Sequence, residues 1–105
     1  MPPSAIPPLD PPAGRVATHV ILHGRVQGVF YRNWTVEQAL ELGLDGWVRN
    51  RNDGTVEALF AGPSAAVAEM VSRCHQGPTH AVVTDVVATP GADPGATGFH
   101  KLPTV

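Results

Sequence analysis

Cysteine is almost absent from this sequence, because Cys74 is the single thiol among 105 residues. One cysteine excludes an internal disulfide and any metal site built from several thiolates. No stretch is apolar over the roughly 20 residues that a membrane-spanning helix needs. The first 14 residues also lack the basic start and the apolar run of a signal peptide. We therefore expect a cytoplasmic protein with neither a metal nor a membrane partner.

Charge is scarce as well. Charged residues make up 15% of the chain and the formal net charge is -2. This balance argues against nucleic-acid binding, which is usually accompanied by a basic patch or stripe. Four of the 7 basic residues nevertheless lie in two short segments, as Arg25 and Arg32 and as Arg49 and Arg51. The sequence therefore leaves room for a local anion site.

Proline and glycine are abundant instead, with 11 residues of each. Proline lacks the backbone donor and restricts the residue before it, so a proline-rich segment forms neither a helix nor a central strand. We predict a disordered proline-rich extension over residues 1–14 and one domain over residues 15–105. A proline-rich ligand for a partner protein is the weaker interpretation of the extension, because no basic residue flanks it.

Hydrophobic periodicity predicts the elements of this domain. Strands are expected at 16–23, 44–50, 55–61 and 80–88, with a short edge strand near 99–102, and helices at 31–42 and 64–74. This order is that of an α+β, ferredoxin-like βαββαβ sandwich, in which two helices cover one face of an antiparallel sheet of four to five strands. In the third strand we expect Glu57 and Leu59 to face away from the core.

Single residues mark the ends of the helices and the core. Gly43 is placed to end the first helix in the left-handed conformation, and Ser64 is a possible N-cap of the second. Cys74 belongs to the apolar stripe of the second helix, which predicts an inert core thiol. Asp53 and Gly54 predict a hairpin turn.

The segment GRVQGVFYR, residues 24–32, places an arginine in the first turn of a helix behind a glycine-bracketed loop. Free backbone N–H groups and a guanidinium at a helix N-terminus are suited to an anion of phosphate size. Arg32 is the expected side-chain ligand of the phosphate. The N–H groups expected to help it belong to Val26, Gln27, Gly28, Val29, Phe30 and Tyr31.

The predicted topology brings Asn50 towards this loop. A strand–helix–strand crossover makes the first two strands parallel, with the third strand between them, so their C-terminal ends meet at one edge of the sheet. Two ladder steps separate these ends by roughly 10 Å. A phosphate and a water fit between the Arg32 fork and the Asn50 amide at that distance.

The usual sets of hydrolytic residues are missing. No serine or cysteine has a recognisable partner base, no Gly-Lys-Ser/Thr makes the loop a P-loop, and no acidic pair or histidine cluster is present. Asn50 can orient a water but is no strong base. A mixed carboxylic–phosphoric anhydride suits such a site, because its leaving carboxylate has a pKa near 4 and needs no acid.

The segments GRVQGVFYR (24–32), LGLDGWVRN (42–50) and DGTVE (53–57) closely resemble the acylphosphatase family, and the resemblance runs from about residue 16 to residue 102. It implies cofactor-free hydrolysis of acyl phosphates to a carboxylate and inorganic phosphate, without a covalent phosphoenzyme. It also implies that Arg32 binds the phosphate and Asn50 orients the water. We expect a monomer that acts on small acyl phosphates.

Other interpretations stay open at this point. Taken alone, Arg32 is an ordinary helix-start arginine paired with Glu37 or another acid, and Asn50 is a turn residue. A non-catalytic anion-binding or regulatory module on the same fold is the alternative to an enzyme. Binding of single-stranded RNA is a weaker third possibility, because the expected open face of the sheet lacks stacked aromatic residues.

Overall fold

The computed structural model describes residues 14–105, so the predicted extension lies outside the described residues except for Gly14. The carbonyl of Gly14 accepts a hydrogen bond from the N–H of Ser64 at 2.7 Å. Gly14 therefore makes a contact with the domain, although it was assigned to the extension.

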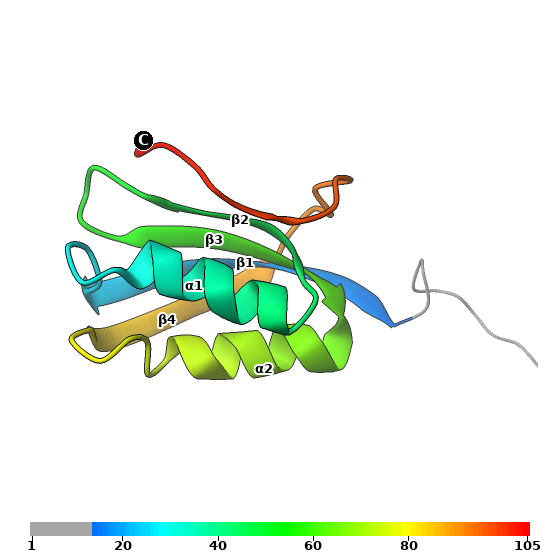
Figure 1. The fold of residues 1–105 in the computed structure, drawn as a ribbon, viewed down its shortest axis with the longest axis horizontal. Helices are drawn as coiled ribbons and strands as arrows, with labels where there is room; N and C mark the ends of the chain where they lie inside the picture. The colour runs from blue at the N-terminus through cyan, green and yellow to red at the C-terminus, as the bar shows by residue number, and fades with distance from the viewer. Residues whose placement is uncertain (1–13) are drawn as a thin grey trace, which may run out of the picture.

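Residues 14–105 form a five-stranded sheet with both helices on one face (Figure 1). The spatial order is β4-β1-β3-β2-β5, and the β1–β3, β1–β4 and β2–β3 pairs are antiparallel. The ferredoxin-like prediction is confirmed. One detail differs, because β5 pairs with β2 in parallel and makes the sheet mixed. The elements are β1 (Arg15–Arg25), α1 (Tyr31–Glu41), β2 (Asp45–Asn50), β3 (Val56–Pro63), α2 (Ser64–Cys74), β4 (Val82–Pro90) and β5 (Phe99–Lys101).

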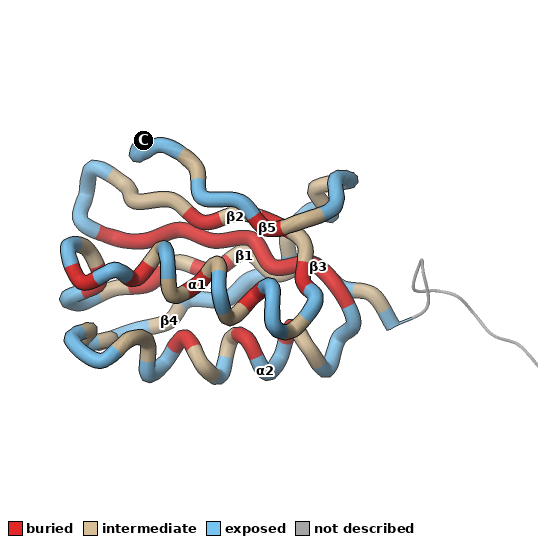
Figure 2. Tube along the Cα trace, in the orientation of Figure 1, coloured by how far each residue is buried: buried red, intermediate tan, exposed pale blue. Residues whose placement is uncertain are grey.

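The core lies between the helices and the sheet (Figure 2). The helix predicted at 31–42 is present as α1, and its buried side chains, Tyr31, Thr35 and Ala39, lie four residues apart on one face. Cys74 closes the buried stripe of α2 and has no exposed surface. Burial raises the pKa of its thiol to about 12, which fits the predicted inert core thiol.

Strand β3 is buried on both faces. Leu59 and Glu57 face away from the core that Val56, Ala58 and Phe60 join, as expected, but other segments cover them, so they are only 7% and 9% exposed. The chain after β4 returns across the second face, where a Cβ on Gly91 would lie 2.7 Å from a Leu59 methyl group. His19 and Arg49 cover Glu57 through hydrogen bonds of 2.6 and 2.7 Å.

The end of α1 agrees with the prediction from the sequence, whereas the start of α2 does not. Gly43 has φ +70, and the N–H groups of Gly43 and Leu44 bond back to Leu40 and Ala39, so the predicted left-handed end of α1 is confirmed. Ser64 is not the N-cap of α2. Pro63 occupies that position without a side-chain cap bond.

Candidate active site

The loop between β1 and α1 begins at a bulge. The β1–β4 register shifts between His23 and Gly24, and Gly24 has φ +120. A Cβ at this position would lie 2.1 Å from the carbonyl oxygen of Val82. Only glycine permits both this conformation and this close approach, so Gly24 fixes the point at which the loop leaves the sheet.

Phe30 is the single non-glycine residue with positive φ in the described chain, at φ 62 and ψ 26. A bulky residue in this conformation costs about 1–3 kcal/mol and persists only where the surroundings hold it. Its side chain is 79% exposed, so its own packing contributes little to holding it. The strain instead belongs to the backbone turn that starts α1, where the Phe30 carbonyl accepts the Trp34 N–H at 3.0 Å.

This turn leaves backbone donors free at the start of α1. Within residues 14–105, the N–H groups of Tyr31, Arg32 and Asn33 have no protein acceptor, and no side chain caps the helix. Free N–H groups and the positive end of the helix dipole both favour an anion here. The Tyr31 hydroxyl holds the same turn against α2, because it donates a hydrogen bond to the backbone carbonyl of Cys74 at 2.6 Å.

A cavity of about 290 Å³ opens at this turn, and both Arg32 and Asn50 line it. The structure therefore brings together the two side chains that the sequence placed at one edge of the sheet. Of the six predicted loop residues, Gln27 and Val29 are not part of the lining. The cavity is lined by Val26, Gly28, Phe30, Tyr31, Arg32, Asn33, Asn50 and Lys101.

Arg32 faces this cavity without a counter-ion from the protein. In the part of the chain that the structure describes, no carboxylate forms an ion pair with it, so the pairing with Glu37 considered from the sequence is not formed. By contrast, Arg49 pairs with Glu57 at 2.7 Å and Arg51 with Asp53 at 3.7 Å. The Arg32 guanidinium thus keeps its charge available for a ligand.

Asn50 ends β2 and is held through its backbone. It pairs with Val56 of β3, and its carbonyl accepts the N–H of Val105 at 3.1 Å. The Val105 carbonyl oxygen in turn accepts the Asn52 N–H at 2.6 Å. These contacts leave the Asn50 amide side chain free to face the cavity.

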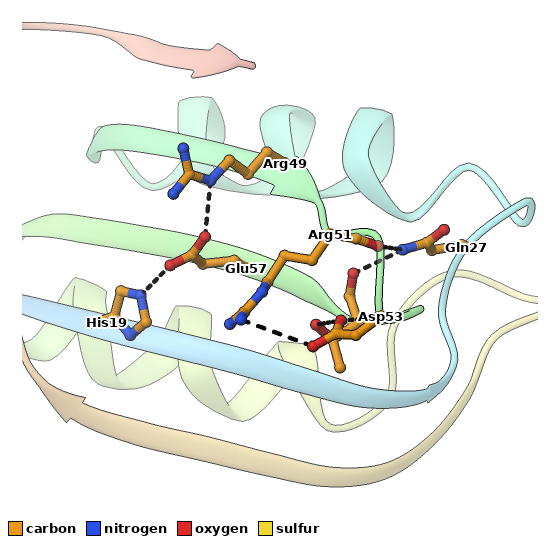
Figure 3. Close-up of polar contacts among 7 residues, drawn as sticks. His19, Gln27, Arg49, Arg51, Asp53 and Glu57 are labelled. Carbon is orange, nitrogen blue, oxygen red and sulfur yellow. Dashed lines mark hydrogen bonds and ion pairs between the residues drawn. The ribbon is translucent and has the colours of Figure 1, made fainter. Parts of the chain in front are cut away.

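The side chain of Gln27 ties the loop to the hairpin that follows Asn50. Its Nε2 donates to the carbonyls of Arg51 and Thr55, both at 2.8 Å (Figure 3). The predicted Asp53-Gly54 turn is confirmed, with φ +93 at Gly54, and Asp53 accepts from the N–H and the hydroxyl of Thr55. The Gln27 side chain therefore links the loop that leads to Arg32 with the hairpin that follows Asn50.

Two lining residues, Asn33 and Lys101, were not predicted from the sequence. The Lys101 ammonium donates to the Asn33 Oδ1 atom at 2.9 Å. Lys101 reaches the cavity because β5 lies parallel beside β2, and both strands end at the same edge. The signal in the sequence was weak, since a lysine at the end of a three-residue strand resembles any surface charge.

Within residues 14–105, an arginine and an asparagine beside free backbone donors, on a ferredoxin-like α+β sheet, form a site with the chemistry to hold an anion. Within residues 14–105, no group of three or more His, Cys, Asp or Glu side chains is placed to hold a metal ion. The Acylphosphatase family model matches residues 18–101. The chain belongs to the acylphosphatase family.

Individual relatives agree with this assignment. The chain is 57% identical over 86 residues to an acylphosphatase of Rhodospirillum rubrum, which covers 82% of this chain and 94% of the relative. It is 55% identical over 93 residues to one of Rhizorhabdus wittichii, covering 87% and 92%. The crystal structure of acylphosphatase from Bacillus subtilis superposes with a TM-score of 0.80 at 35% identity, covering 83% of this chain and 98% of that one. An acylphosphatase structure from Coxiella burnetii gives a TM-score of 0.84 at 30% identity, covering 87% and 96%.

Proposed function

We propose that this protein hydrolyses acyl phosphates to a carboxylate and inorganic phosphate by direct attack of water. Arg32 and the backbone N–H groups of residues 26–31 hold the phosphoryl group, and Asn50 orients the water. The observation that carries these roles is one cavity that joins an arginine without a counter-ion, free helix-start donors and the Asn50 amide. The activity itself is that of the acylphosphatase family.

This reaction requires the protein mainly to position the phosphoryl group and the water and to stabilise negative charge. Phosphoryl transfer passes through a loose transition state, in which negative charge spreads over the oxygens of the transferred group. Arg32 can contact two of these oxygens, and preorganised N–H groups stabilise the charge without reorganising. The Asn50 side-chain oxygen accepts a hydrogen bond from the water and aims its lone pair at phosphorus. The proton of the water passes to a phosphoryl oxygen of the substrate, and the carboxylate leaves without an acid.

The alternative of a non-catalytic anion-binding module is not favoured. Relatives at more than half identity carry the name of an enzyme over most of the chain. The two walls of the cavity are also tied together by Gln27, which suits a reaction that depends on the distance between Arg32 and Asn50.

We further propose that the enzyme is a cytoplasmic monomer with its domain at residues 15–105 and an extension at residues 1–14. The buried single thiol supports a reducing compartment, and the cavity lining described above comes from one chain. Among the described residues, none of the helices has the length and hydropathy required to traverse a bilayer.

Kinetics of four variants with a chromogenic acyl phosphate test the assigned roles. We expect Arg32→Ala and Asn50→Ala each to lower kcat/KM by about 100- to 1,000-fold, the usual loss for one preorganised donor. Arg32→Lys keeps the charge but loses the fork, so it should recover only part of the activity. Asn52→Ala is the matched control, because the Asn52 contact found here uses its backbone, and its activity should stay within about twofold.

Two results would contradict the proposal. Wild-type activity in Asn50→Ala would remove the water-positioning role. Comparable turnover of a phosphate monoester would contradict the requirement for a good leaving group, because an alkoxide needs a general acid and the proposed mechanism uses none.

A further inference from the structure

Lys101 lies where β5 and β2 end side by side. The two strands are parallel, with Lys101 opposite Val48, and the ladder continues as the Leu102 N–H donates to the Val48 carbonyl at 2.9 Å. Asn50 follows Val48 by two residues on the same strand. Lys101 therefore forms part of the cavity wall on the β5 side.

A neutral partner holds the Lys101 ammonium. Its Nζ donates to the Asn33 Oδ1 atom at 2.9 Å, and Asn33 directly follows Arg32 in the first turn of α1. Within residues 14–105, no carboxylate forms an ion pair with Lys101. An ammonium has three N–H donors and the Asn33 amide uses one of them. Two donors and a full positive charge remain for a ligand.

The cavity thus carries two cations without counter-ions, Arg32 and Lys101. The free N–H groups of α1 and its dipole already assist Arg32 in binding the phosphoryl group. The cavity of about 290 Å³ is larger than a phosphoryl group and one water require, so part of it is available to the start of the acyl chain.

We propose that Lys101 is a specificity-determining residue that binds a second anionic group, a carboxylate or a phosphate, on the acyl part of the substrate. Asn33 is its positioning residue. The inference rests on the proposed function, because it assigns the phosphoryl group to Arg32 and the glycine loop. The enzyme then prefers acyl phosphates with an additional negative charge to those with a neutral acyl group.

A matched pair of substrates tests this preference, namely benzoyl phosphate and 3-carboxybenzoyl phosphate. The added carboxylate lies meta on a rigid ring, so it cannot displace the phosphate within the molecule. A third substrate, benzoyl phosphate with a phosphate ester at the meta position, asks whether a second phosphate is recognised better than a carboxylate. Uncatalysed hydrolysis is measured for each and subtracted.

We expect Lys101→Met to lower kcat/KM about tenfold more for the two substrates with a meta carboxylate or phosphate than for benzoyl phosphate, mainly by raising KM. Lys101→Arg should preserve the preference, and Asn33→Ala should reduce it. Arg51→Met removes a surface charge that pairs with Asp53, and it should leave the ratio between substrates unchanged. An equal loss on all substrates in Lys101→Met would place Lys101 at the phosphoryl group and overturn the proposal, as would an unchanged ratio.

A binding measurement separates this proposal from the proposed function. Lys101 is the only lysine of the sequence, so reductive ¹³C-methylation gives one side-chain NMR signal that keeps its charge. Isophthalate, the product of the carboxylated substrate, should shift this signal, whereas benzoate should shift it much less. Failure of all substrates to turn over would refute the proposed hydrolysis, while an unshifted Lys101 signal with isophthalate would refute recognition by Lys101.

Discussion

Replacement of Gln27 by alanine separates the spacing of the two cavity walls from the groups that contact the substrate. The change removes two hydrogen bonds of 2.8 Å, to the carbonyls of Arg51 and Thr55. Both carbonyls keep another partner, because Arg51 accepts from Gly54 at 3.1 Å and Thr55 accepts from Arg51 at 2.9 Å. No buried acceptor is left unsatisfied, so the full desolvation penalty does not arise.

The stability cost therefore stays near the net value of two ordinary hydrogen bonds, about 1–2 kcal/mol in total. For a domain of this size, that loss corresponds to a fall of roughly 4–16 °C in Tm. The expected loss of catalytic activity in Gln27→Ala is larger than this loss of stability alone would suggest. A displacement of about 1 Å between the Arg32 and Asn50 walls can lower the rate by up to ~100-fold.

Urea unfolding and steady-state kinetics with an acyl phosphate measure the two effects on the same samples. Gln38→Ala is the matched control, because the Gln38 side chain accepts one bond from Arg73 at 2.7 Å and does not line the cavity. We expect Gln27→Ala to lower kcat by at least about tenfold and Gln38→Ala to leave it within about twofold. A Gln27→Ala protein that is less stable by 1–2 kcal/mol, as estimated above, but fully active when folded would refute the positioning role.

Three further predictions concern the rest of the domain. Gly46→Ala should destabilise the fold by more than about 3 kcal/mol, because its Cβ would lie 1.8 Å from the Leu59 carbonyl oxygen at φ +136, and denaturant unfolding or loss of soluble protein measures this. Burial opposes the charge of the Glu57 carboxylate, but hydrogen bonds from its two basic partners outweigh this and lower its pKa. The ionised Glu57 thus contributes to stability above the unfolded-state pKa of about 4.3, and this contribution is lost as the pH falls through the lower folded-state pKa. The free energy of unfolding of Glu57→Gln should therefore depend less steeply on pH over this acid range than that of the wild type. An unchanged slope would contradict this prediction. The Cys74 thiol, with its pKa raised to about 12, should react with a disulfide reagent only as fast as the protein unfolds, and rapid labelling of the native state would contradict its burial.

Local signals in the sequence were sufficient for the elements and for six of the eight residues that line the cavity. Gly43 ends α1 where its left-handed conformation was expected, and the Asp53-Gly54 turn forms the expected hairpin. The crossover rule then placed the ends of β1 and β2 at one edge. That rule depends only on the order of elements, so it brought Arg32 and Asn50 together without knowledge of side-chain packing.

The failures have tertiary causes. Ser64 does not cap α2 with its side chain, and its own N–H is satisfied by the distant carbonyl of Gly14. Leu59 is covered by the chain around Gly91, which no periodicity in β3 can indicate. Lys101 reaches the cavity through the parallel register of a strand of three residues. Each of these contacts joins segments far apart in the chain, where sequence patterns carry little information.

The central position of β3 has a consequence for the time course of folding. This strand supplies no lining residue, yet it separates and aligns β1 and β2, which carry the two walls of the cavity. Its ladder is long-range, since Arg15 pairs with Pro63, and the outer pair of β1 joins Thr18 to Pro90. Domains dominated by such pairings fold slowly, in milliseconds to seconds, because the chain loses the entropy of loop closure before the long-range contacts can stabilise it. Enzymatic activity should therefore return after dilution from denaturant only as the whole sheet assembles. The rate at which turnover is regained should then equal the rate of global folding.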